Sequence, residues 1–160
     1  MSGLSQPFDS ELSYRGAIGA TLALAQREIR VFDRDLLSMG FEDGKRIDLM
    51  TAFLSAGRFR SIRFVVHDDG PIQRLAPRLL AFLSRFNHAV EVRRTPEHLR
   101  HLTDCWVLAD GAHGTVRFHR DHPRGKQIWN DKSQIGPWWQ RAEELWMESE
   151  PCSPASVTGL

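Results

Sequence analysis

The clearest indication of the fold is the segment SIRFVVHDDGP at residues 61–71. Its run of apolar residues shows almost no polar alternation, which is typical of a parallel strand buried on both faces. The polar HDDG segment then stops the strand, and Pro71 suits the first turn of a helix. A buried strand that leads directly into a helix indicates an α/β fold.

The same pattern extends to both sides of this stretch. Apolar spacing and punctuating residues predict, in chain order, a helix from Ser13, a strand at 28–32, a helix at 45–56 closed by Gly57, the strand at 61–66, a helix from Pro71 to about Asn87 that Pro77 interrupts, and a strand at 89–93. Three successive helix–strand units of this kind predict parallel strands joined by right-handed crossovers.

Beyond the third strand the pattern changes. CWVLA at 105–109 and TVRF at 115–118 are joined by the turn-rich DGAHG, which predicts an antiparallel hairpin. A polar loop follows to Asp131, and an apolar stripe after Ser133 predicts a final helix. The predicted fold class is therefore an α/β sandwich whose mixed sheet has parallel strands and a C-terminal antiparallel hairpin.

Composition indicates one soluble domain of ordinary size. The chain has 160 residues, 41% hydrophobic and 26% charged, with 21 Lys+Arg against 20 Asp+Glu. We expect a flexible lead at 1–12, a domain at 13–149 and a disordered tail at 150–160. Cys105 and Cys152 lie in dissimilar surroundings, and no run approaches the roughly 18 apolar residues of a membrane span, so we expect a reduced cytoplasmic protein.

Two short segments carry a family resemblance. HLRHLTDCWVLADG at 98–111 and EELWMES at 143–149, with the order of elements over about 13–149, resemble one half of the phospholipase D-like superfamily. The chain also resembles an uncharacterised family of bacterial, mainly proteobacterial, domains in which that half stands alone. The resemblance implies an α/β/α sandwich and the pairing of two copies, so a homodimer is expected.

The catalytic motif implied by this resemblance is degenerate. Active members carry His-x-Lys-x4-Asp, in which His attacks phosphorus, Lys holds the phosphate oxygens and Asp supports the site. Aligning the motif on Asp110 places Thr103 at the His position and Cys105 at the Lys position. A threonine hydroxyl needs an adjacent base to attack phosphorus. We therefore expect no catalytic residue and no cofactor, with Asp110 acting as a turn residue.

Several arginines follow the predicted strands. Ligands of open α/β sheets bind beyond the carboxyl ends of the strands, and arginine matches phosphate in bidentate geometry. The candidate phosphate-binding residues are Arg93, Arg94, Arg100 and Arg117. The histidines of the segment 113–122 have no spacing diagnostic of a metal site, so no metal is predicted.

These observations favour a non-catalytic binding or scaffold module with a protein partner or a second copy of itself. One alternative is a nucleic-acid-binding or phosphate-binding domain that uses Arg93, Arg94 and Arg117. A further alternative is a phosphodiesterase with a rearranged site, drawn from Thr103, Cys105, Asp110, His98 and His101. The near-neutral charge argues against dominant electrostatic attraction to nucleic acid, although it leaves room for a local patch.

Overall fold

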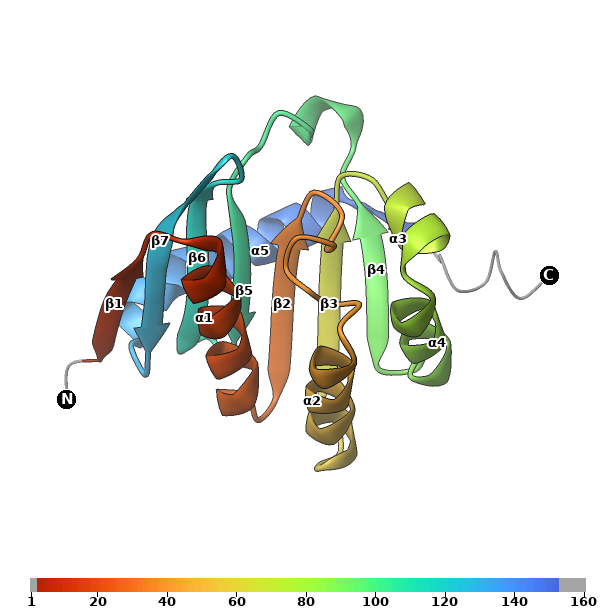
Figure 1. The fold of residues 1–160 in the computed structure, drawn as a ribbon, viewed down its shortest axis with the longest axis horizontal. Coiled ribbons are helices and arrows are strands. Elements are labelled where there is room, and N and C mark those ends of the chain that lie inside the picture. Colours follow the sequence, from red (N-terminus) through yellow and green to blue (C-terminus); the bar gives the residue numbers. More distant parts are fainter. Residues whose placement is uncertain (1–2, 153–160) are drawn as a thin grey trace.

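The computed structural model describes residues 3–152 (Figure 1). Its elements are β1 (Leu4–Phe8), α1 (Glu11–Leu24), β2 (Glu28–Asp33), α2 (Gly44–Ser55), β3 (Ser61–Val66), α3 (Gly70–Leu75), α4 (Pro77–Arg85), β4 (Val90–Arg94), η1 (Glu97–Leu99), β5 (Cys105–Ala109), β6 (His113–His119), β7 (His122–Trp129), α5 (Lys132–Glu148) and β8 (Glu150–Cys152). Pro77 splits the helix after β3 into α3 and α4, as predicted. Within residues 3–152, no helix combines the length and apolar character needed to cross a membrane.

The strands of residues 3–152 form one mixed sheet with the order β1-β7-β6-β5-β2-β3-β4-β8. β2, β3 and β4 are parallel, and the other neighbouring pairs are antiparallel. The predicted fold class is confirmed. Because β5 runs opposite to β2, the start of β5 lies at the edge of the sheet where the parallel strands end.

Helices cover both faces of the sheet. α1 to α4 lie on one face, and α5 crosses the other (Figure 1). Val31 and Phe64 belong to the larger apolar core, whereas Phe32 and Val65 belong to the core that includes α5 residues. β2 and β3 therefore have buried side chains on both faces, which explains their nearly continuous apolar runs.

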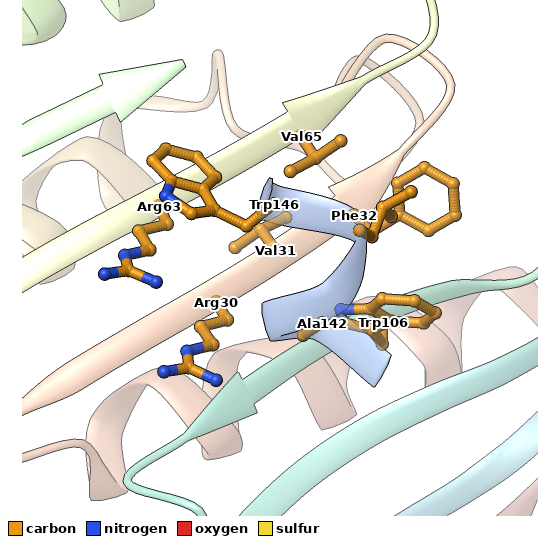
Figure 2. A pocket seen from close by; sticks show the side chains of 9 residues that line it. Arg30, Val31, Phe32, Arg63, Val65, Trp106, Ala142 and Trp146 are labelled. Carbon is orange, nitrogen blue, oxygen red and sulfur yellow. The ribbon is translucent and has the colours of Figure 1, made fainter. Parts of the chain in front are cut away.

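Arginine and tryptophan side chains join α5 to the sheet. The guanidinium carbon of Arg30 lies 3.8 Å from the ring centre of Trp139, and those of Arg63 and Arg93 lie 5.0 Å and 4.0 Å from that of Trp146. Figure 2 shows Arg30, Arg63 and Trp146 at this contact. The cavity beside them is only about 10 Å³, room for about one water molecule. This contact is packed core rather than a ligand site.

Three segments expected to be irregular form strands instead. Leu4–Phe8 of the expected flexible lead is β1, His122–Trp129 of the expected polar loop is β7, and Glu150–Cys152 of the expected tail is β8. β1 pairs with β7 and β8 pairs with β4. Main-chain pairing with neighbouring strands forms these segments. β1 and β8 are the edge strands of the sheet and β7 lies between β1 and β6, and the mostly polar side chains of all three carry no apolar alternation that would predict a strand. The rest of the expected tail, 153–160, lies outside the described residues.

Candidate functional site

A pocket of about 470 Å³ opens at the carboxyl edge of the parallel strands. Its lining residues come from the segments after β2 and β3, the end of β4, the residue after η1, and the turn between β6 and β7, which lie along one edge of the sheet in Figure 1. They are Arg34, His67, Asp68, Arg94, Arg100 and Arg120. Because ligands of open α/β sheets bind at this edge, the pocket is the candidate site.

Backbone hydrogen bonds hold the segment after β2 beside the segment after β3. The buried Asp33 accepts a hydrogen bond from Leu36 N at 2.9 Å, and Leu36 adopts a φ of 71°. The carbonyl oxygen of Arg34 accepts from the backbone N–H groups of His67 and Asp68, both at 3.0 Å. Two segments that are distant in the sequence thereby place their side chains around one pocket.

His67 is the buried member of the lining. Its Nδ1 lies 2.7 Å from Thr95 Oγ1, and its Nε2 lies 2.8 Å from the carbonyl oxygen of Leu102. A carbonyl oxygen only accepts, so Nε2 carries the proton and Nδ1 accepts from the Thr95 hydroxyl. Burial lowers the pKa of His67, which favours this neutral ring. His67 therefore links the end of β3 to the segment that leads into β5.

The lowered pKa of His67 predicts that stability depends on pH below about 6.5, the ordinary histidine value. Between the folded pKa and that value, the unfolded chain binds a proton that the folded chain does not, so the free energy of unfolding falls as the pH decreases. Urea unfolding at pH values from 7 down to 5 measures this slope. We expect His67→Gln to flatten the slope and the exposed control His101→Gln to preserve it; equal slopes in all three proteins would contradict the assignment.

The pocket borders the segment that leads into β5. The backbone N–H of Arg120 donates to the carbonyl oxygen of Thr103 at 2.8 Å. Arg100 Nη2 lies 3.5 Å from the carbonyl oxygen of Thr95, whose hydroxyl bonds to His67. This pocket, the arginine pocket, thus lies beside Thr103, the residue that the family resemblance aligns with the motif histidine.

The lining carries an excess of positive charge. Arg94 Nη1 lies 3.3 Å from Asp69 Oδ1, so one of the four guanidinium groups has a carboxylate partner. Among the described residues, the Arg100 guanidinium contacts only the carbonyl oxygen of Thr95. Within residues 3–152, the guanidinium groups of Arg34 and Arg120 make no hydrogen bond and no ion pair. Uncompensated guanidinium groups that converge on one pocket attract an anion and can bind phosphate or carboxylate in bidentate geometry.

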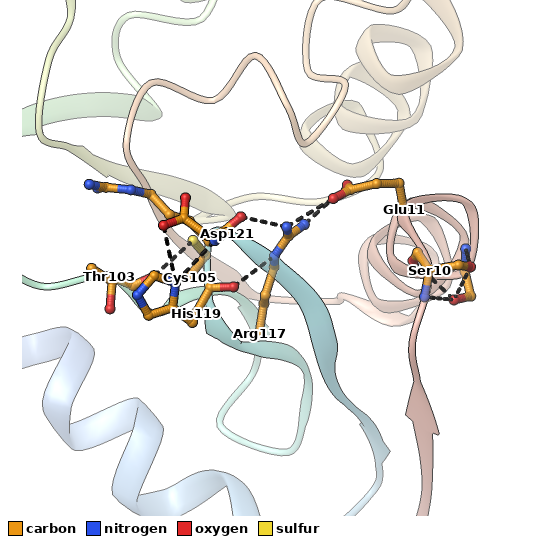
Figure 3. Close-up of polar contacts among 9 residues, drawn as sticks. Ser10, Glu11, Thr103, Cys105, Arg117, His119 and Asp121 are labelled. Atoms are coloured by element: carbon orange, nitrogen blue, oxygen red, sulfur yellow. Dashed lines mark hydrogen bonds and ion pairs between the residues drawn. The ribbon is translucent and has the colours of Figure 1, made fainter.

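Thr103 and Cys105 do not reproduce the chemistry of the motif. Cys105 is 2% exposed and lies with its Sγ 3.8 Å from the Thr103 carbonyl oxygen (Figure 3). Burial raises the pKa of the Cys105 thiol, so it stays protonated and uncharged. Within the described residues, the Thr103 hydroxyl has no hydrogen-bonded base. This arrangement offers neither an activated nucleophile nor a cation at the two motif positions.

Asp110 lies at the opposite edge of the sheet. It follows the last residue of β5, five positions after Cys105 and about 17 Å along the strand. Its carboxylate accepts hydrogen bonds from the backbone N–H groups of Gln26 and Arg27 at 2.8 Å and of Glu28 at 2.9 Å. Asp110 therefore holds the segment that enters β2.

The structure separates the four arginines predicted to bind phosphate. Arg94 and Arg100 line the pocket. Arg93 instead packs against α5, where its Nη1 donates to the carbonyl oxygen of Trp146 at 2.9 Å and its Nε lies 2.8 Å from the Glu91 carboxylate. Consecutive residues of a strand point to opposite faces, so Arg93 and Arg94 cannot share one site.

Arg117 faces α1. It is 4% exposed, and its two terminal nitrogens donate to the Glu11 carboxylate at 3.1 Å and 2.9 Å (Figure 3). Its guanidinium carbon lies 4.8 Å from the ring centre of Tyr14. This bidentate pair between the buried Arg117 and the exposed Glu11 joins β6 to α1 and leaves Arg117 outside the arginine pocket.

Four of the six lining residues are missing from the predicted phosphate site: Arg34, His67, Asp68 and Arg120. Arg34 and His67 each follow an apolar strand directly. The tendency of ligands to bind beyond the carboxyl ends of parallel strands could therefore have predicted both residues. Arg120 carried no such signal, because its position depends on the pairing of β6 with β7.

The histidines considered for catalysis or for metal binding lie outside the pocket lining. His98 and His101 are exposed, and His98 Nε2 lies 3.5 Å from the Glu148 carboxylate. His113 Nδ1 accepts a hydrogen bond from Asn130 N at 2.9 Å. In the part of the chain that the structure describes, no group of three or more His, Cys, Asp or Glu side chains is arranged to hold a metal ion.

Comparison with known proteins supports the fold and identifies a family. Residues 11–155 match the family described as a domain of unknown function (DUF7931). No curated protein matches this chain.

Three solved structures share the architecture. The phospholipase D family member Nuc from Salmonella typhimurium aligns with a TM-score of 0.70 and 14% identity, over 94% of this chain and 99% of that one. NucT from Helicobacter pylori aligns with a TM-score of 0.65 and 8% identity, over 94% and 100%. The archaeal chromatin protein TrmBL2, which binds DNA, aligns with a TM-score of 0.64 and 15% identity, over 92% of this chain and 54% of its own. At these identities the likeness shows a phospholipase D-like fold alone.

Proposed function

Because this chain belongs to the DUF7931 family and has a phospholipase D-like fold, we propose that it is a non-catalytic domain that binds a phosphate-bearing ligand in the arginine pocket. The observation that carries this proposal is that four arginines line one pocket at the carboxyl edge of the sheet. The backbone of Arg120 is hydrogen-bonded to Thr103, the residue that the family resemblance aligns with the motif histidine.

The electrostatics of the pocket support binding. Arg34 and Arg120 are held by main-chain hydrogen bonds that do not involve their guanidinium groups. Both side chains can therefore turn to a ligand without breaking an ion pair of the folded protein. Charge-assisted hydrogen bonds are each worth about 1.5–3 kcal/mol, and exposure to solvent reduces that contribution.

The chemistry of the motif positions supports the absence of catalysis. An attack on phosphorus needs a nucleophile that a base or a lowered pKa has activated. Thr103 has no hydrogen-bonded base within residues 3–152, and burial keeps the Cys105 thiol protonated. The domain then retains a place for phosphate without the group that would attack it.

Loss of two pocket arginines is expected to weaken binding of inorganic phosphate. An NMR titration of ¹⁵N-labelled protein at constant ionic strength should shift the backbone resonances of Arg34, His67 and Arg120 first. We expect the double variant Arg34→Gln/Arg120→Gln to bind phosphate at least about tenfold more weakly than the parent protein, because both uncompensated cations are removed.

The matched control is Arg27→Gln/Arg58→Gln. It removes the same charge from exposed residues that precede β2 and β3, at the opposite edge of the sheet. Equal weakening by both double variants would show a nonspecific charge effect and contradict the pocket. Turnover of bis(p-nitrophenyl) phosphate that Thr103→Ala abolishes would replace the proposal with the rearranged phosphodiesterase.

The homodimer, the protein partner and the cytoplasmic location expected from the sequence stay predictions. The arginine pocket is assembled within one chain, so the proposed binding does not depend on them.

A further inference from the structure

The arginine pocket is polar throughout its lining. Pockets for organic molecules are usually lined mainly by apolar and aromatic side chains, with a few polar groups that set orientation. Four of the six lining residues here are arginines, and the other two are His67 and Asp68. The lining therefore suits a ligand that is polar over most of its surface.

The lining also lacks a platform for a nucleobase. Proteins that bind single-stranded nucleic acid stack the bases on aromatic rings. Within the described residues, His67 supplies the only ring of this lining. Its two nitrogens bond to Thr95 and Leu102, and it packs edge-on against Phe32 with ring centres 5.1 Å apart. Trp139 and Trp146 of α5 instead contact Arg30 and Arg93 on the face of the sheet that α5 covers.

The charge of the pocket exceeds that of one phosphodiester. Asp69 offsets Arg94 at 3.3 Å, and Asp68 contributes one negative charge to the lining. Arg34, Arg100 and Arg120 remain, so the pocket keeps a net positive charge greater than one. A phosphodiester linkage carries a single negative charge, which would leave part of this charge uncompensated.

Resting on the proposed function, we infer that the pocket binds a compact condensed phosphate, a ligand with two or more directly linked phosphate groups. Arg34, Arg100 and Arg120 come from three separate segments of the chain, so they can contact different phosphates of one ligand. The pocket volume of about 470 Å³ is within the range of small-molecule sites. Recognition by charge and bidentate hydrogen bonds needs no apolar wall.

Calorimetric titration with orthophosphate, pyrophosphate and tripolyphosphate tests this inference. The full chain is used at constant ionic strength in a buffer free of divalent cations, with a short oligothymidylate as the nucleic-acid probe. We expect tripolyphosphate to bind at least about tenfold more tightly than orthophosphate and than the oligothymidylate. Arg34→Gln/Arg120→Gln should remove most of this gain, whereas the control Arg27→Gln/Arg58→Gln should keep it.

The outcomes separate this inference from the proposed function. Orthophosphate and tripolyphosphate binding with equal affinity in the pocket would overturn the condensed-phosphate inference and leave a single-phosphate site. Tighter binding of the oligothymidylate would overturn it in favour of nucleic acid. Absence of binding by all four probes would overturn both proposals. Circular dichroism of each variant shows whether the fold is intact, and a variant that unfolds is replaced by the single change Arg34→Gln.

Discussion

Replacing Asp110 with alanine is expected to lower the free energy of unfolding by about 3 kcal/mol. The Asp110 carboxylate accepts three backbone hydrogen bonds, from Gln26, Arg27 and Glu28. Hydrogen bonds to a charged group are worth about 1.5–3 kcal/mol each, and solvent at this edge replaces part of the loss. Asp110 also has a φ of 59°, a conformation that costs alanine roughly 1 kcal/mol more than aspartate.

Asp110→Asn is the matched control, because asparagine keeps a side-chain oxygen acceptor and tolerates this backbone conformation. We expect it to lose about half as much stability as the alanine variant, in urea unfolding at pH 7. An alanine variant within about 0.5 kcal/mol of the parent protein would refute the structural role. A loss of the expected size would show that Asp110 stabilises the entry into β2 through these hydrogen bonds.

Gly125→Ala is expected to destabilise the protein by about 4 kcal/mol or prevent folding. Gly125 is buried in β7 between its partners Phe8 on β1 and Arg117 on β6. A Cβ atom would lie 2.6 Å from Phe8 Cζ and closer still to the carbonyl oxygen of Val116. Backbone atoms of a paired strand cannot move aside without disrupting the sheet, so the clash cannot be relieved without a large loss of stability.

The control is Gly16→Ala in α1, where an added Cβ atom meets nothing within 4 Å. Glycine inside a helix costs roughly 0.5–1 kcal/mol relative to alanine, so this variant should be slightly stabilised. Both variants are compared by urea unfolding, or by soluble yield and circular dichroism where Gly125→Ala does not fold. A Gly125→Ala protein as stable as the parent would show that β7 does not pair closely on both sides.

The candidate site was only partly predictable from the sequence. Arg94 is placed at the carboxyl edge by the end of β4, which the sequence pattern predicts closely. The same pattern does not exclude Arg93 from the site, because the face of the sheet to which a strand residue points depends on the register of strand pairing. Arg117 resembles a ligand-binding arginine in the sequence, but its bidentate pair with Glu11 forms across 106 residues of chain. Such a long-range pair leaves no local signal.

Local features of the sequence are sufficient to predict the α/β class, the parallel direction of β2, β3 and β4, and the split at Pro77. These features are uninterrupted apolar runs, helical spacing and proline geometry. That β1, β7 and β8 join the sheet is visible in the tertiary structure alone, because main-chain pairing forms them without a side-chain pattern. The tertiary structure also decided that Arg34, Arg100 and Arg120 share a pocket with Arg94, since loops from distant parts of the chain meet only when the strands pair.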